Sequence, residues 1–193
     1  SDASTFRREL KRLAGAGKLS AGPLAYAAPR KSLEELYDSD ADPHQIRNLA
    51  ASPAHEATLV RMRRVLREWL LKTRDAGFLA EPQMWERLRA GGTPLKIAAD
   101  AKQYPLARLL DAAELVGGAK AVPEQMKLLR DPDDGPRYWA AVGLHAAGRD
   151  AASARDRLRQ ALTDASAVVR IEAAAALAEL GETGDSLPVL ERA

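Results

Sequence analysis

The 193-residue chain is long enough for one domain of ordinary size or two small ones. Its composition, with 46% hydrophobic and 29% charged residues, is typical of globular proteins. Few aromatics and abundant alanine favour closely packed helices over a β-sandwich, and a net charge of +2 with interleaved acidic and basic residues argues against nucleic-acid binding. The segment has no cysteine and no apolar run near the ~20 residues of a membrane span, which excludes disulfides, thiolate metal sites, a cysteine nucleophile and a transmembrane helix here.

The start of the chain predicts one helix and one strand. Residues 5–14 have their apolar side chains on one helical face, whereas glycine and proline predict an irregular stretch over residues 20–30. Leu33–Asp38 is expected to be a short strand followed by a turn. A lone strand leaves its backbone groups unpaired, and the sequence offers no convincing second strand. We therefore expect this segment to belong to a larger protein.

A long helix is predicted from Ser52 to Asp75, because Ser52 suits the cap position and Pro53 the first helical position. Apolar residues at helical spacing predict that one face of this helix is buried. That face comprises Leu59, Met62, Leu66, Trp69, Leu70 and Thr73. A short helix is expected at residues 83–90. The break at Gly91–Pro94 then predicts two domains, residues 1–92 and 93–193.

The second half of the chain repeats itself. Residues 131–148 align without gaps with residues 164–181, so the period is 33 residues, and a degenerate earlier copy fits residues 105–117. Each unit has a first helix, a turn opened by aspartate and a second helix rich in alanine. A period in this range, with two helices per unit, is typical of a solenoid. We expect Arg137 and Arg170 to lie along one edge and to bond the turn aspartate of a neighbouring unit.

These units resemble HEAT repeats, specifically the short type of phycobilisome-lyase-like HEAT proteins. The aspartate, Val-Arg, paired-alanine and Leu-Gly spacing of that type is nearly intact over Asp164–Gly181, and the resemblance extends over about residues 104–193. It implies an α-α superhelix whose surface is available to a protein partner.

A second resemblance concerns the stretch from Glu35 to Leu49. Glu35-Leu36-Tyr37-Asp38, Asp42-Pro43 and Asn48-Leu49 resemble the closing signature of the sulfatase family, and Ser39 and Gln45 depart from its usual pattern. Residues 73–79 also resemble the run that follows this signature in heparan N-sulfatase-like and arylsulfatase-like members, and the likeness spans about residues 5–84. It implies a small C-terminal subdomain in which a short antiparallel sheet packs beside a final helix. The expected fold class is therefore mainly all-α: a short strand-containing remnant of that subdomain followed by an α-α superhelical HEAT-like stack.

No catalytic, cofactor-binding or metal-binding residue is assigned in this segment. The sulfatase nucleophile lies in Cys/Ser-x-Pro-x-Arg and becomes formylglycine, and the nearest match, Ser186-Leu187-Pro188, lacks the arginine. Asp131, Asp133 and Asp134 are interpreted as helix caps rather than as a calcium site. The resemblance implies a parent enzyme that uses calcium and formylglycine to cleave sulfate esters or sulfamates, in a family that is often periplasmic, secreted or lysosomal.

The candidate interaction surface consists of His44, Arg137, Tyr138, Trp139 and Arg170. By helical geometry, either Tyr138 or Trp139 should be core. The expected partners are the upstream catalytic domain of the parent enzyme and a protein bound on the repeat surface, with neither nucleic acid nor membrane. The alternative is a stand-alone HEAT-repeat scaffold that binds a protein and performs no chemistry.

Overall fold

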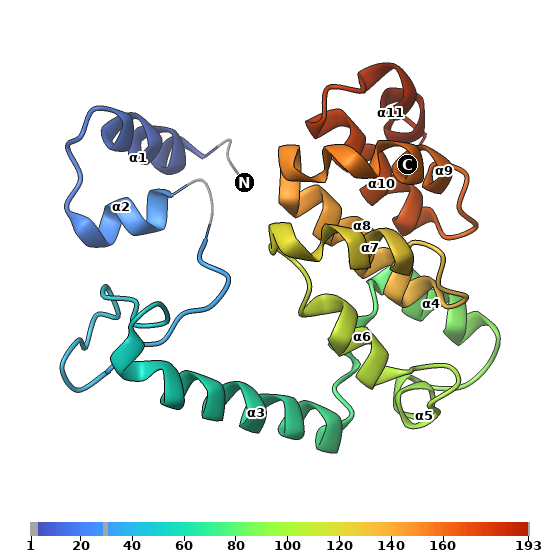
Figure 1. Ribbon diagram of the computed structural model, residues 1–193, viewed down its shortest axis with the longest axis horizontal. Helices are drawn as coiled ribbons and strands as arrows, with labels where there is room; N and C mark the ends of the chain where they lie inside the picture. Colours follow the sequence, from blue (N-terminus) through green and yellow to red (C-terminus); the bar gives the residue numbers. More distant parts are fainter. Residues whose placement is uncertain (1–3, 29–30, 193) are drawn as a thin grey trace. The chain divides into compact units, whose positions relative to one another are not determined.

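The computed structural model describes residues 4–28 and 31–192, and within them it contains helices and loops but no β-strand (Figure 1). The chain forms two compact units, residues 1–67 and 68–193. The expected all-α architecture is confirmed. The division at residue 92, drawn from the break at Gly91–Pro94, stays a prediction.

In the first unit, helices α1 (Thr5–Gly15) and α2 (Ala21–Ala27) pack against each other. The Ser4 hydroxyl caps α1 by accepting a hydrogen bond from the Arg7 amide at 3.2 Å. Helix α2 forms where an irregular stretch was expected. Pro23 lies in its first turn, where the N–H that proline lacks has no helical partner anyway, so it does not interrupt the helix.

The predicted strand at Leu33–Asp38 is wrong, because a neighbouring loop satisfies its backbone groups. The Leu36 amide donates to Asn48 Oδ1 at 3.0 Å, and the Leu49 amide donates to the Leu36 carbonyl at 2.7 Å. Asn48 Nδ2 donates to the Glu34 carbonyl at 2.9 Å. The side-chain amide of Asn48 thus takes the place of a partner strand, and the segment needs no sheet.

Helix α3 (Glu56–Thr73) follows the 3-10 turn Pro53–His55, close to the predicted helix bounds. The predicted buried face is mostly wrong. Leu59 is buried and Leu70 packs against the core of the second unit, but Trp69 is 53% exposed, and Met62 and Leu66 are similarly open. The apolar pattern identified the helix correctly, whereas no layer of described residues covers the middle of its apolar stripe.

The second unit begins with a small core made by α4 (Glu81–Arg89), α5 (Pro94–Ala99) and α6 (Leu106–Ala113). Tyr104 lies at its centre with its ring fully buried. The Tyr104 hydroxyl donates to the Asp75 carbonyl at 2.5 Å and accepts from the Phe78 amide at 3.1 Å. One buried tyrosine therefore fastens the loop after α3 to this core.

The repeats follow as α7 (Val122–Leu128) with α8 (Asp134–Ala147), α9 (Arg155–Ala161) with α10 (Ala167–Glu179), and a last helix α11 (Thr183–Leu190). Helix α8 contacts α6, α7 and α10, and α10 contacts α9 and α11. Alanines at equivalent positions of α8 and α10 are completely buried, which allows the two helices to approach closely: Ala140, Ala141, Ala173 and Ala174. The stacked helix pairs expected from the 33-residue period are confirmed.

Candidate functional site

The turns that open α8 and α10 have the same geometry, and they form the edge on which the polar side chains gather. Asp131 Oδ1 accepts from the Asp133 amide at 2.9 Å, and Asp164 Oδ1 accepts from the Ser166 amide at 2.8 Å. Asp131 and Asp164 are 33 residues apart and make the same bond to the residue two positions later. The repeat period is therefore visible in individual hydrogen bonds as well as in helices.

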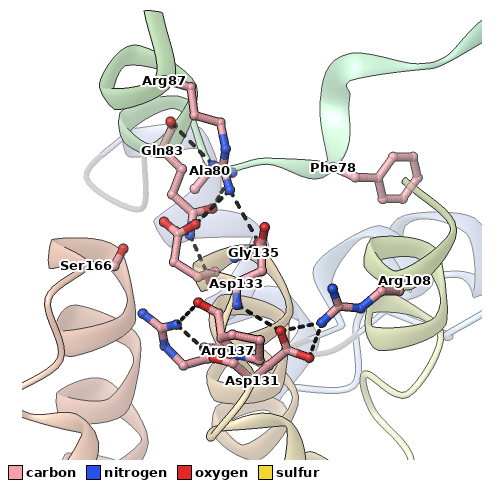
Figure 2. A network of polar contacts seen from close by, with 12 residues as sticks. Phe78, Ala80, Gln83, Arg87, Arg108, Asp131, Asp133, Gly135, Arg137 and Ser166 are labelled. Atoms are coloured by element: carbon pink, nitrogen blue, oxygen red, sulfur yellow. Dashed lines mark hydrogen bonds and ion pairs between the residues drawn. The ribbon is translucent and has the colours of Figure 1, made fainter. Parts of the chain in front are cut away.

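Arg137 links these two turns. Its Nη1 donates to the carbonyls of Asp131 at 2.8 Å and Pro132 at 3.1 Å (Figure 2). Its Nε and Nη2 hold the two carboxylate oxygens of Asp164 at 2.8 and 2.9 Å. The hydrogen bond to Asp164 is the main cause that raises the pKa of Arg137. The predicted bond from one repeat to the aspartate of the next is confirmed for Arg137.

Arg170 reproduces half of this arrangement. Its Nη1 donates to the carbonyls of Asp164 at 2.7 Å and Ala165 at 3.0 Å, which are equivalent to the carbonyls that Arg137 binds. The edge also includes an ion pair between Arg108 and Asp131, and Arg159 bonds Asp185 at 2.9 Å. Along this edge arginines engage the carboxylates of other units, which favours a bracing role over acid–base chemistry.

Helix α4 is bound to the same edge, and the sequence did not predict this. Gln83, which is almost fully buried, donates to the Asp134 carbonyl at 2.9 Å and to its carboxylate at 2.8 Å. Arg87, one turn later, reaches Asp134 at 2.7 Å and Asp133 at 3.3 Å (Figure 2). Gln83 and Arg87 are spaced i and i+4 and share one helical face with Glu86, and this polar face was the signal that could have indicated the attachment.

Of the three aspartates interpreted as helix caps, Asp133 has that role, whereas Asp131 accepts from the Asp133 amide and the Asp134 carboxylate accepts from the Gln83 and Arg87 side chains. Asp133 is the N-cap of α8, and its carboxylate accepts from the Gly135 amide at 2.8 Å. Among the described residues, no group of three or more histidine, aspartate or glutamate side chains is placed to hold a metal ion.

The two aromatic residues of the predicted surface both belong partly to the core. Trp139 Nε1 donates to the Phe78 carbonyl at 2.8 Å, and its ring lies 6.3 Å from that of Phe78. Tyr138 packs edge-on against Trp139 at 5.5 Å and contacts the core of the repeats. The pair therefore joins the small core to the repeat core, and Tyr138 adjoins Glu172, whose charge adds to burial in raising the Tyr138 pKa.

The five predicted surface residues are divided between the two units. His44 lies exposed on a loop of the first unit, whereas Arg137, Tyr138, Trp139 and Arg170 belong to the second. A different histidine contributes to the repeats: His145 Nδ1 lies 3.2 Å from the Glu172 carboxylate on α10, and this hydrogen bond is the main cause that raises its pKa.

Comparison with known proteins agrees with this geometry. Residues 122–193 match the HEAT repeats family. The chain is also similar to an ulvan-active sulfatase of Formosa agariphila, with 33% identity over 95 residues; the match covers 49% of this chain and 16% of that protein. No solved structure matches the chain. HEAT repeats commonly mediate protein interactions. In the described part of the chain, no helix is both long enough and apolar enough to cross a bilayer. The stacked helix pairs at the C-terminal end of the chain thus match HEAT repeats over residues 122–193, and the chain has a partial similarity to a sulfatase in addition.

Proposed function

We propose that this chain is the C-terminal, non-catalytic part of a sulfatase-like hydrolase, in which the HEAT repeats brace the enzyme and present a surface to a protein partner. The 95-residue similarity to a sulfatase is the observation that carries the proposal. The upstream part would cleave sulfate esters or sulfamates and would hold the calcium and formylglycine of that family. This chain would supply none of the reacting groups.

The loop around Asn48 supports the proposal. Residues that resemble the sulfatase signature hold this loop together: the Leu36 amide donates to Asn48 Oδ1, and the Leu49 amide donates to the Leu36 carbonyl. Asp38 Oδ1 accepts from the amides of Asp40 and Ala41 in the adjoining turn, each at 3.1 Å. Their spacing in the sequence therefore has a structural role in folding a compact loop. A motif whose side chains are engaged in folding a loop fits an accessory subdomain.

The carboxylates of the turn edge also fit a bracing role. Asp131, Asp133, Asp134 and Asp164 are engaged by arginine side chains, and Asp131, Asp133 and Asp164 accept backbone amides as well. A carboxylate held by several hydrogen bonds is fixed in position, as a bracing role requires.

The test compares the complete product of the reading frame with a version that lacks residues 93–193. In the complete protein, sulfate release from para-nitrophenyl sulfate should depend on the cysteine or serine of an upstream Cys/Ser-x-Pro-x-Arg motif. The truncated protein should keep its formylglycine but lose stability or partner binding. Hydrolysis by the isolated 193-residue chain would contradict the proposal. If the chain is instead a stand-alone scaffold, none of these protein versions should hydrolyse the sulfate ester. Partner binding should then be the same with or without the upstream sequence.

A further inference from the structure

A shallow groove of about 460 Å³ lies between α4 and the turns that open α8 and α10. Glu86 and Arg87 line it from α4, Asp133 and Asp134 from the first turn, and Ser166 from the second. Arg87, Asp133 and Asp134 take part in the bracing contacts described above, whereas Glu86 and the Ser166 hydroxyl do not.

Ser166 is the N-cap residue of α10, yet its hydroxyl caps nothing. It is only 5% exposed, and its Oγ has no hydrogen-bond partner among the described residues. The equivalent residue of the previous repeat, Asp133, does cap its helix. Figure 2 shows Ser166 at the start of its helix, at the helix end that faces Gln83 and Arg87. A buried hydroxyl without a partner is costly, so this one is suited to a ligand that enters the groove.

The charges of the groove favour a cation. Its lining carries the carboxylates of Glu86, Asp133 and Asp134 against the guanidiniums of Arg87 and Arg137, which leaves an excess of one negative charge. Arg137 is already held by Asp164, so it does not neutralise the lining. Arg87 is shared between two aspartates, and the exposed Glu86 has no polar partner among the described residues.

The shape of the groove favours a slender cation. Besides Gln83, its uncharged walls include the small apolar surfaces of Ala90, Pro132 and Ala165. An alkyl chain can lie along such surfaces while a primary ammonium at its end donates up to three hydrogen bonds. A guanidinium is broader and needs a planar pair of acceptors, whereas one hydroxyl and one carboxylate suit a compact ammonium.

We propose that this groove binds a primary ammonium group, presented by a lysine side chain of a protein partner. The ammonium donates to Ser166 Oγ and to the Glu86 carboxylate, and the lysine stem lies against the apolar walls. The proposal rests on the groove residues alone and does not depend on the relation to sulfatases.

The experiment is a titration of the ¹⁵N-labelled 193-residue chain, followed by amide chemical shifts, with the peptide acetyl-Gly-Lys-Gly-amide. The matched probe replaces lysine by norleucine, which keeps the stem and removes the charge. We expect saturable shifts at Glu86, Asp134 and Ser166 with the lysine peptide only. Glu86→Gln should weaken binding roughly tenfold and Ser166→Ala about threefold, because each removes one acceptor.

Glu191→Gln is the matched control, since it removes the same charge from an exposed residue outside the groove. It should leave the affinity unchanged. Ser166→Ala should fold normally because its hydroxyl makes no bond within the described chain. Equal shifts with the norleucine peptide, or equal affinity of the Glu86→Gln and Glu191→Gln variants, would overturn the proposal. Equally tight binding of n-butylammonium would identify a free amine as the occupant and overturn the assignment to a lysine side chain.

Discussion

Arg137 on α8 holds both carboxylate oxygens of Asp164, which belongs to the next repeat, through hydrogen bonds of 2.8 and 2.9 Å. Both side chains are largely buried, at 14% and 12% exposed. The pair is therefore shielded from solvent, and the same guanidinium satisfies two carbonyls of the preceding turn. One side chain thus fixes the turn of its own repeat and its position relative to the next.

The first prediction concerns this pair. Arg137→Ala should lower the free energy of unfolding by about 3 kcal/mol, because it leaves a buried carboxylate and two carbonyls without their partner. Chemical denaturation measures the loss. Arg12→Ala, which breaks an exposed pair with Glu9 on α1, should leave the free energy of unfolding nearly unchanged. A double-mutant cycle of Arg137 and Asp164 with a coupling near zero would show that the contact does not join the repeats.

The second prediction concerns Gly143, which faces the buried side chain of Gln125. A Cβ at residue 143 would overlap Gln125, whose Nε2 donates to the Leu115 carbonyl at 2.8 Å. Glycine to alanine usually stabilises a helix by about 1 kcal/mol, but here the overlap should make Gly143→Ala destabilising by ~1–3 kcal/mol. Gly184→Ala in α11 is the control, since its added Cβ meets no atom within 4 Å. A melting temperature of Gly143→Ala as high as that of Gly184→Ala would mean that Gln125 moves aside freely.

The third prediction concerns pH. Glu172 raises the pKa of His145 above its ordinary value of 6.5, chiefly through their hydrogen bond. The folded protein therefore holds this proton more tightly than the unfolded chain does. The resulting stability is fully present below pH 6.5 and is lost as the pH rises through the raised pKa of the folded state. Thermal melts between pH 5 and 8 should show this loss in the wild type and not in Glu172→Gln. An NMR titration in which His145 has an ordinary pKa would refute the assignment.

The fourth prediction concerns Asn48. Asn48→Ala should destabilise the first unit by ~1–2 kcal/mol, because Leu36, Ala50 and Glu34 each lose a hydrogen bond to its side chain. The Leu36 amide should then exchange with solvent much faster, as hydrogen exchange followed by NMR would detect. Asn48→Asp keeps the acceptor oxygens and should retain most of the Leu36 protection. Unchanged exchange at Leu36 in the alanine variant would mean that Asn48 does not hold this loop.

The repeats could be predicted from the sequence because their information is local and periodic. A fixed spacing of aspartate, arginine, alanine and glycine specifies each helix pair, and Gly148 and Gly181 at the ends of the second helices both adopt the positive φ that glycine permits. The Arg137–Asp164 bond followed from the same repetition. Where each unit resembles its neighbour, one alignment predicts both the fold and its contacts.

The errors lie where the structure depends on contacts that the local sequence does not specify. The strand prediction failed because the Asn48 side chain, 12 residues from Leu36, satisfies the backbone. The attachment of α4 was missed because Gln83 and Asp134 are 51 residues apart. Trp69 was expected to be core, but it is half-exposed, so Trp69→Ala should now cost less than ~1 kcal/mol rather than the loss typical of a buried aromatic.

The sequence of the reading frame upstream of Ser1 tests the proposed function most directly. The account predicts an uninterrupted frame that encodes a Cys/Ser-x-Pro-x-Arg motif together with the acidic residues of a calcium site. A start codon immediately before Ser1, with no such motif in frame, would contradict the relation to a sulfatase and leave a HEAT-repeat scaffold.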